Sequence, residues 1–385
     1  MDTTLQNQHL TPQPAQKQQT LPALTSLRFF AALLIVLHHF GPNTLGGHFD
    51  VLDQLFRMGG SGVGFFFVLS GFVMAWVYWN GGQSIVLRKY YVARLSRIYP
   101  LYLVGFFAAI SILFIVPSAR VPWLDPHWYL IAAALGLFLL QAWVPLASNL
   151  INGPGWSLSA EAFFYLIFPW FIQSSVCRWM SSRPIRFIAL WTFLGAAPSA
   201  IVFFYFPSIL EEGPQRNSFL LNLLGFFPLF RVFEFFQGIC FGLICLQKRH
   251  WFQGRLYGDA GLLLCFAVLT LVLVLSTDAS VILFHNGLLS PVFGYIIAYV
   301  GLSGRRVFDF LAHPFLILLG EASFSMYILH MPLKSLLAFG WRQVIGPDNT
   351  SGFLIALLAF IIAVSIVSFK WIELPLRKFV RKGAP

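Results

Sequence analysis

The sequence predicts an all-α fold: a polytopic bundle of about ten transmembrane helices with one additional short or re-entrant helix. Of the 385 residues, 58% are hydrophobic, only 10% are charged and 43 are phenylalanine. A soluble domain of this length has too little interior to bury so much apolar surface. Apolar stretches of membrane-spanning length also recur along most of the chain, and lysine and arginine gather in short clusters between them.

The basic clusters predict the topology. They lie at 84–97, 178–186, 248–255, 305–306 and 377–382. Short loops rich in lysine and arginine face the cytoplasm in membrane proteins. The formal net charge of +11 therefore indicates a lipid bilayer as the partner, with no nucleic acid. We expect both the N-terminus and the C-terminus to be cytoplasmic.

Eleven apolar segments are candidate spans. Two basic loops, 84–97 and 178–186, both face the cytoplasm by this rule, so an even number of crossings must separate them. Three candidates lie there, and we predict that 129–145, the segment with the weakest boundaries, is short or re-entrant on the outer side. Irregular backbone at membrane depth is tolerated where it lines a cavity. The candidates are 24–40, 61–79, 98–117, 129–145, 158–175, 186–206, 228–246, 258–276, 281–302, 315–338 and 351–371.

The chain divides into a tail and one membrane domain. The first twenty residues are rich in glutamine and proline and almost uncharged, so we predict that 1–22 is a disordered cytoplasmic tail. Residues 23–385 form the transmembrane domain, whose first span must itself direct insertion. The four cysteines lie in or beside apolar segments without CxxC spacing, which favours small buried hydrophobes. No metal site is predicted.

The first span, SLRFFAALLIVLHHF at 26–40, carries costly ionisable side chains. On a helix each residue advances by about 100°, so eleven positions return to within roughly 20° of the start. Arg28 and His39 therefore share one face, whereas His38 points away. One interpretation is that Arg28 extends to the headgroups and the histidines mark an interface. We favour a functional pair, because ionisable groups inside a membrane are rarely present without a role.

Five further blocks complete a resemblance to a known family. The opening together with GGSGVGFFFVLSGFVMA at 59–75 resembles that of the bacterial membrane-bound acyltransferase-3 family. Members transfer acyl groups, often acetyl, to sugars of surface polysaccharides, lipopolysaccharide or related carbohydrates. The likeness covers about 24–380. The further blocks, in the expected order, are RLSRIYPLY at 94–102, NGPGWSLSAEAFFYLIFP at 152–169, FRVFEFFQGICFGL at 230–243, ASFSMYILHMPL at 322–333 and IELPLRKF at 372–379.

The resemblance implies an O-acyltransferase of the cell inner membrane. Its acyl donor is expected to be acyl-coenzyme A, with no bound cofactor, and its acceptor a glycan or lipid-linked sugar. His39 is then the natural base for the acceptor hydroxyl, because the pKa of imidazole lies near neutrality. A covalent acyl-imidazole is the alternative. One position departs from the family: Gly64 stands where an aspartate is usual, so that carboxylate is absent or supplied elsewhere.

Glu161 and two arginines are the other principal candidates. Glu161 is expected to enter the membrane from the outer side at the depth of His39 and to orient its imidazole. The alternative is helix capping by Ser157 or Ser159 with Glu161 in the first turn. Guanidinium groups suit phosphate, so the Arg-x-x-Arg stretch is expected to bind coenzyme A. The arginines are Arg94 and Arg97, which Arg28 can join; their alternative role is the positive-inside signal.

Weaker candidates complete the set. Trp156, Glu321 and His330 are weaker candidates for substrate contact; interface anchoring is favoured for Trp156, and structural hydrogen bonding for Glu321 and His330. Arg231 and Glu234 are spaced for an internal ion pair. The GGSGVG block lacks the features of a phosphate loop, and its glycines favour close helix contact.

A transporter or flippase of a lipid-linked sugar is the competing function. Such a protein would use the same line of polar residues as a substrate path. Transporters are often built from internal repeats, and no repeat is visible in this sequence. Together with the resemblance, this favours the enzyme.

Overall fold

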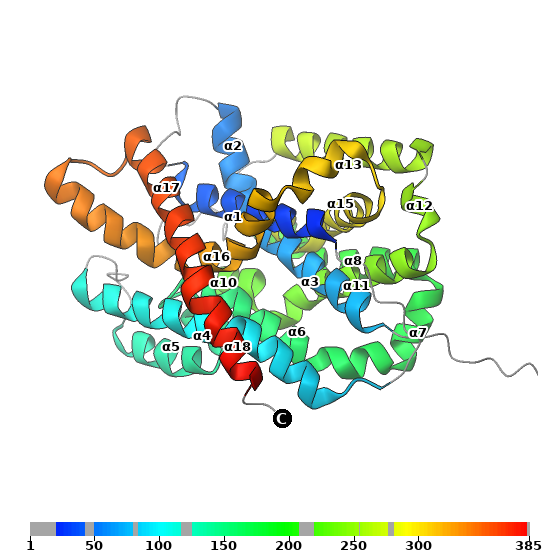
Figure 1. Ribbon diagram of the computed structural model, residues 1–385, viewed down its shortest axis with the longest axis horizontal. Coiled ribbons are helices and arrows are strands. Elements are labelled where there is room, and N and C mark those ends of the chain that lie inside the picture. The colour runs from blue at the N-terminus through cyan, green and yellow to red at the C-terminus, as the bar shows by residue number, and fades with distance from the viewer. Residues whose placement is uncertain are drawn as a thin grey trace, which may run out of the picture.

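The computed structural model describes residues 21–42, 50–79, 84–116, 125–207, 219–253, 255–275 and 281–382, and all regular secondary structure in these ranges is helical (Figure 1). The all-α prediction is confirmed, while most of the predicted tail, residues 1–20, lies outside the described residues. The longest helices are α1 (Pro22–Phe40), α3 (Gly62–Tyr78), α4 (Leu87–Ile115), α6 (Gly155–Gln173), α8 (Pro184–Tyr205), α11 (Pro228–Gln247), α13 (Arg255–Leu275), α16 (Pro314–Val344) and α17 (Ser351–Ser368).

In the described ranges, eight helical segments are long and apolar enough to cross a membrane, and a ninth is gained if α6 and the bent α7 (Ser175–Ser182) form one span. The expectation of about ten spans agrees roughly with this number. The predicted span that lacks a helix of this length is 281–302, where the structure has α15 (Ser290–Leu302), a shorter apolar helix. It is separated from α14 (Val281–Leu283) by a broken turn at Phe284–Leu288. The remaining short helices are α2 (Asp50–Met58), α10 (Phe219–Phe226), α12 (His250–Gln253) and α18 (Leu374–Lys382).

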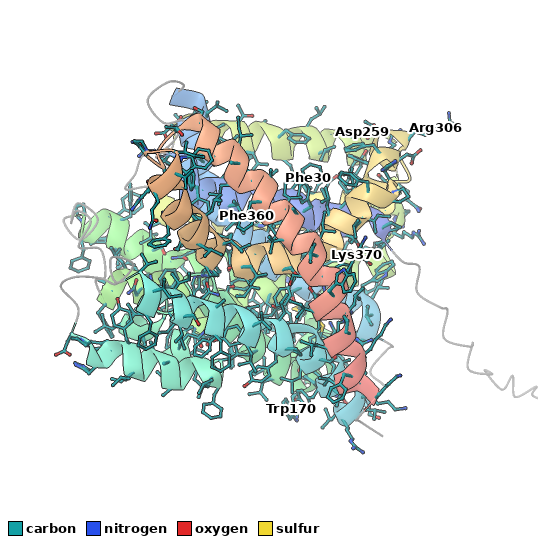
Figure 2. The ribbon with its side chains drawn as sticks, turned by 60° about the vertical axis from the view of Figure 1, so that its left-hand side comes forward. Phe30, Trp170, Asp259, Arg306, Phe360 and Lys370 are labelled. Atoms are coloured by element: carbon teal, nitrogen blue, oxygen red, sulfur yellow. The ribbon has the colours of Figure 1, made fainter. Side chains whose placement is uncertain are left out.

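The outer flanks of the bundle are apolar. Large side chains such as Phe30, 41% exposed, and Trp170, 56% exposed, project outward from their helices (Figure 2). A lipid bilayer solvates such side chains, whereas water does not. The chain is therefore a multi-pass membrane protein.

The segment predicted as a short or re-entrant helix is indeed short. Helix α5 (His127–Leu137) ends early and is followed by two 3₁₀ turns. The irregular backbone that follows is hydrogen-bonded by α6: Ser159 Oγ donates to the Leu139 carbonyl at 2.6 Å and accepts from the Ala142 N–H at 3.3 Å. Irregular backbone at membrane depth requires such partners.

Close helix contacts fix the centre of the bundle. A Cβ atom on Gly71 would lie 2.0 Å from the Phe235 carbonyl oxygen, so glycine lets α3 and α11 pack backbone to backbone. Gly320 does the same for α16 against α1, where a Cβ would lie 1.9 Å from the Thr25 carbonyl oxygen. Gly59 fits against Leu34 and so supports the prediction that the glycine-rich block permits close helix contact. The α1–α16 contact positions the residues described next.

Candidate active site

Helix α1 carries both ionisable residues of the first span toward α16. Arg28 lines a cavity together with Ser323 and Tyr327 of α16. The His39 ring stacks on the ring of His330, also on α16, with centroids 5.1 Å apart and planes inclined by 25°. Both residues thus face the same helix, as their spacing predicts. Eleven residues of helix separate them by about 16 Å.

His38 has different surroundings. Its Nδ1 lies 2.8 Å from the Phe56 carbonyl oxygen of α2, so the ring is turned toward that helix. This orientation agrees with the expectation that His38 points away from the Arg28–His39 face. The two adjacent histidines are therefore distinguishable by their contacts.

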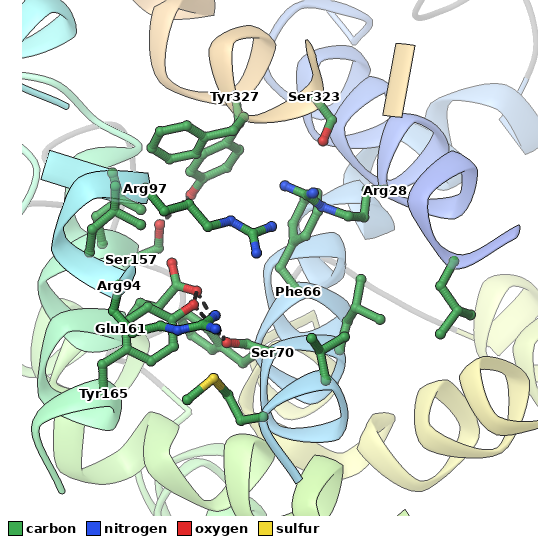
Figure 3. A pocket seen from close by; sticks show the side chains of 18 of the residues that line it. Arg28, Phe66, Ser70, Arg94, Arg97, Ser157, Glu161, Tyr165, Ser323 and Tyr327 are labelled. Carbon is green, nitrogen blue, oxygen red and sulfur yellow. Dashed lines mark hydrogen bonds between the residues drawn. The ribbon is translucent and has the colours of Figure 1, made fainter. Parts of the chain in front are cut away.

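A cavity of about 400 Å³ lies between α1, α3, α4, α6 and α16. On α3 its lining runs from Val63 to Val77, which corresponds to about 21 Å of helix. Most of the wall is apolar, and the polar side chains converge on one part of it, as Figure 3 shows. These polar residues are Arg28, Ser70, Arg94, Arg97, Ser157, Glu161, Tyr165, Ser323 and Tyr327.

The three arginines reach the cavity from two helices. Arg94 donates to the Tyr78 hydroxyl at 3.0 Å, and its guanidinium lies over the rings of Tyr78 and Tyr165 at 5.3 and 5.7 Å from their centroids. Arg28 and Arg97 make no hydrogen bond or ion pair with any residue in the described ranges. Their donors therefore face the cavity ready for an anion.

Glu161 belongs to this cavity. Its Oε1 accepts a hydrogen bond from Ser70 Oγ at 3.1 Å and another from the Tyr165 hydroxyl. The capping interpretation is wrong, because α6 begins at Gly155 after Pro154, with no side-chain cap. Glu161 also makes no hydrogen bond or ion pair with His39 in the structure. The carboxylate shares a cavity with Arg28 and not with the histidine.

The ring beside His39 is His330. His39 is exposed, whereas His330 is completely buried. His330 Nδ1 lies 2.6 Å from the Tyr327 carbonyl oxygen, and its Nε2 has no hydrogen-bond partner in the described part of the chain. A proton on Nδ1 satisfies that carbonyl and leaves Nε2 with a free lone pair.

Tyr327 stands between the cavity and this histidine pair. Its hydroxyl is 2.7 Å from Ser157 Oγ and donates to the Pro154 carbonyl at 3.2 Å. Its ring centroid lies 6.1 Å from that of His330. Tyr327 therefore lines the cavity and also packs near the ring of His330.

Two weaker candidates lie elsewhere. Trp156 is 9% exposed and packs on Phe226, with the Arg231 guanidinium over its ring, outside the cavity lining. Glu321 is exposed and makes no hydrogen bond or ion pair with the described residues. Within the same ranges, no group of three His, Cys, Asp or Glu side chains is placed to hold a metal ion.

Arg231 and Glu234 form the predicted internal ion pair. Arg231 Nε lies 2.9 Å from Glu234 Oε2, and both side chains are buried. A Cβ on Gly64 would lie 2.6 Å from Glu234 Oε1, so a carboxylate occupies the space beside the glycine that replaces the family's aspartate. A carboxylate of α11 therefore lies beside Gly64, a relation between distant segments that spacing alone does not reveal.

The sequence did not predict the contacts of several residues in and near the cavity. Ser70 and Tyr165, which hold Glu161, are ordinary residues of apolar spans. Glu373 and Arg377 belong to the quoted block 372–379, but that block indicated only a family likeness and a basic tail. Glu373 accepts a hydrogen bond from Ser325 of α16, and the charge of Arg377 is opposed by Arg94 and Arg97 of α4, all far away in the sequence.

The fold and the site define a class: a multi-pass helical membrane protein with a cation-lined cavity inside its bundle. More specifically, the chain belongs to the acyltransferase-3 family, whose model, described as an acyltransferase domain, matches residues 21–370. The protein is therefore a membrane O-acyltransferase, and the transporter alternative is set aside.

Individual relatives agree. The chain is 31% identical over 321 residues to the acyltransferase MdmB of Streptomyces mycarofaciens, covering 80% of this chain and 78% of the relative. It is 24% identical over 383 residues to the O-acetyltransferase OatA of Staphylococcus aureus, covering 93% of this chain but 57% of that relative. The chain thus spans somewhat more than half the length of OatA. Comparison with solved structures finds no match.

Proposed function

We propose that this enzyme takes an acyl group, most simply acetyl, from acyl-coenzyme A and transfers it to a hydroxyl of a sugar. The sugar belongs to a surface polysaccharide, lipopolysaccharide or related glycan, or to a lipid-linked precursor. The donor enters from the cytoplasm, where both chain termini lie, and the acceptor approaches from the outer side of the cell inner membrane. No bound cofactor takes part.

The separation of Arg28 and His39 along α1, with Arg97 of α4 on the Arg28 side, carries this proposal. Coenzyme A has phosphates at one end, a thioester at the other and an extended pantetheine arm between them. The cavity offers unpaired guanidinium groups at Arg28 and Arg97 and an elongated, mostly apolar wall for the arm. Its lining includes Tyr327, whose ring centroid lies 6.1 Å from that of His330, the ring stacked on His39.

His39 is the proposed base. It removes the proton from the acceptor hydroxyl as the oxygen attacks the thioester carbonyl carbon. The tetrahedral intermediate then collapses, the carbon–sulfur bond breaks and the coenzyme A thiolate takes the proton back from the imidazole. Transfer through an acyl-imidazole on His39 is the alternative, with the acceptor hydroxyl attacking in a second step.

Glu161 has its best-supported role at the donor end. Its carboxylate holds Ser70 and Tyr165, and it offsets part of the positive charge of Arg28. We propose that Glu161 fixes the cavity wall and keeps the arginines in place before the donor binds. That Glu161 also orients the His39 imidazole remains a prediction.

The decisive experiment compares the adjacent histidines. Membranes containing wild type, His39→Ala or His38→Ala are supplied with acetyl-coenzyme A and assayed for free thiol and for acetylated glycan. His39→Ala should lose at least about 100-fold in turnover, because general-base catalysis contributes on that order. It should also retain donor binding. His38→Ala is the matched control and should keep most of its activity.

Three results would contradict the proposal. A wild-type protein that releases no thiol would exclude acyl-coenzyme A as the donor. Loss of turnover in His38→Ala, with His39→Ala active, would assign the base to the other face of α1. Thiol release without an acetylated glycan in the surface fraction would exclude the proposed acceptor class.

A further inference from the structure

The C-terminal helix α18 lies against the part of α4 that carries the cavity arginines. It continues from α17 through a π-helical turn at Phe369–Glu373 and runs along α4, as Figure 1 shows. Arg381 Nε donates to Ser96 Oγ at 3.3 Å. Because Ser96 lies between Arg94 and Arg97 in the sequence, α18 contacts α4 at the Arg-x-x-Arg stretch.

One face of this segment is built around a buried carboxylate. Glu373, Arg377 and Arg381 follow one another at intervals of four residues and so lie along one side of the helix. Glu373 is 5% exposed and accepts a hydrogen bond from Ser325 Oγ at 3.0 Å. Its charge acts on Arg28, Arg97 and Arg377, which ties α18 electrostatically to the cavity.

Positive charge exceeds negative charge in this cluster. Among the described residues, five arginines surround two carboxylates, which leaves three positive charges. Arg377 is partly buried and is opposed by Arg97, Arg381 and Arg94. It makes no hydrogen bond or ion pair with another described residue. The arginines are Arg28, Arg94, Arg97, Arg377 and Arg381, and the carboxylates are Glu161 and Glu373.

Partly buried like charges are costly unless an anion joins them. We infer that Arg377 and Arg381 form an outer phosphate subsite, which binds the phosphomonoester on the ribose of the acyl donor. This inference rests on the proposed function.

The order of groups in the donor supports the assignment. With the thioester at the Tyr327 end, the diphosphate meets the arginines of the cavity wall. The ribose phosphate lies still farther from the thioester, beyond the diphosphate. Arg377 and the exposed Arg381 stand outside the cavity lining, next to Arg94 and Arg97. They occupy the place that the last phosphate would reach.

The test uses two donors that differ by one phosphate. Wild type, Arg377→Ala and Lys378→Ala are purified in detergent without added lipid. The apparent KM of each is measured by thiol release with acetyl-coenzyme A and with acetyl-dephospho-coenzyme A. Wild type should prefer acetyl-coenzyme A by about tenfold, and Arg377→Ala should lose that preference through a KM about tenfold higher for acetyl-coenzyme A alone. Lys378→Ala removes the same charge from an exposed neighbouring position and should retain the preference.

Other outcomes would overturn the inference. Equal weakening of both donors in Arg377→Ala would mean that the residue acts on the diphosphate or on folding. Equal KM values for both donors in wild type would show that no side chain reads the ribose phosphate. A preference that Arg377→Ala leaves intact, with reduced binding to vesicles of anionic lipid, would assign the subsite to a lipid headgroup.

Failure of the proposed function gives a different result, because wild type would then use neither donor. A low yield of folded Arg377→Ala does not prevent the test. Arg381→Ala, at the more exposed position, is then tested with the same two donors. Its preference for acetyl-coenzyme A should fall by a smaller factor than that expected for Arg377→Ala.

Discussion

Arg97 and Arg231 are both arginines inside the helix bundle, but their surroundings differ. Arg231 is 2% exposed, pairs with Glu234 at 2.9 Å and donates to Asn286. Asn286 in turn donates to Ser199, so the polar groups form a closed network. Arg97 faces a cavity and has no hydrogen-bond partner in the described ranges.

The difference separates a charge that is paired within the chain from one whose donors face a cavity, as the proposed donor site requires. A buried charge that is matched by its own chain locks helices together and leaves no space. A guanidinium that faces empty volume keeps its donors for a molecule from outside. Burial alone does not identify either role. The two arginines differ in whether another side chain of the protein pairs with the guanidinium group.

The largest expected effect is on the closed network. Glu234→Ala leaves the Arg231 charge buried and unpaired, which should lower the free energy of unfolding by about 3–5 kcal/mol. Thermal unfolding in detergent measures the loss. The double variant Arg231→Leu with Glu234→Leu removes both charges and should recover most of the stability. Equal destabilisation by Arg97→Ala would erase the distinction between the two arginines.

Replacing Arg97 should affect binding instead. Loss of one charge-assisted contact to phosphate costs about 1.5–3 kcal/mol, so Arg97→Ala should raise the apparent KM for acyl-coenzyme A roughly ten- to a hundredfold. The maximal rate should fall less, and Arg97→Lys should restore only part of the affinity, because lysine lacks the planar fork. Donor affinity unchanged in Arg97→Ala would return the residue to a topology signal.

Gly64 provides a third test, at the edge of the closed network. Gly64→Ala brings a methyl group to 2.6 Å from Glu234 Oε1 and should cost about 1–3 kcal/mol through overpacking. Gly64→Asp, which restores the family's usual residue, adds a like charge and should be less stable still. Combining Gly64→Asp with Glu234→Ala should relieve the strain. A stable Gly64→Asp single variant would show that the network is looser than described.

The smallest effect is expected at an exposed pair. Arg342 Nε lies 2.8 Å from Asp348 Oδ1, and this contact lowers the pKa of Asp348. The pair stabilises the protein above the ordinary pKa of aspartate, about 4, and the gain is lost as the pH falls through the lowered value. Arg342 is 59% exposed, so Asp348→Asn should cost at most about 0.5 kcal/mol at pH 7. Unfolding curves at pH 7 and pH 3 test whether this difference disappears in acid.

Local periodicity made the first span predictable. The helix that carries Arg28 and His39 runs without interruption through both residues, so the 100° rule held and placed them on one face. The Arg231–Glu234 pair was predictable for the same reason, since both partners lie on one helix. Segment 129–145 was predicted to be short or re-entrant because the two basic loops on either side both face the cytoplasm, so an even number of spans must separate them.

Contacts between distant helices were not predictable from spacing. The sequence predicts a span that begins at 158 and places Glu161 at the depth of His39. The helix instead begins earlier, at Gly155, and Glu161 faces α3 and α4. His330 was recognised only as a weak candidate, because its partner lies on α1. Glu373 has its hydrogen-bond partner on α16, and no local pattern connects the two segments.

The position of Tyr327 has a consequence for the permeability of the membrane. If the cavity and the exposed His39 were connected, they would together form a path for protons and water through the bundle. The Tyr327 ring, whose hydroxyl is held by Ser157 and Pro154, lies between the two and is expected to obstruct such a path. Because the same side chain also lines the cavity, we expect it to limit leakage of protons and water through the bundle while no substrate is bound.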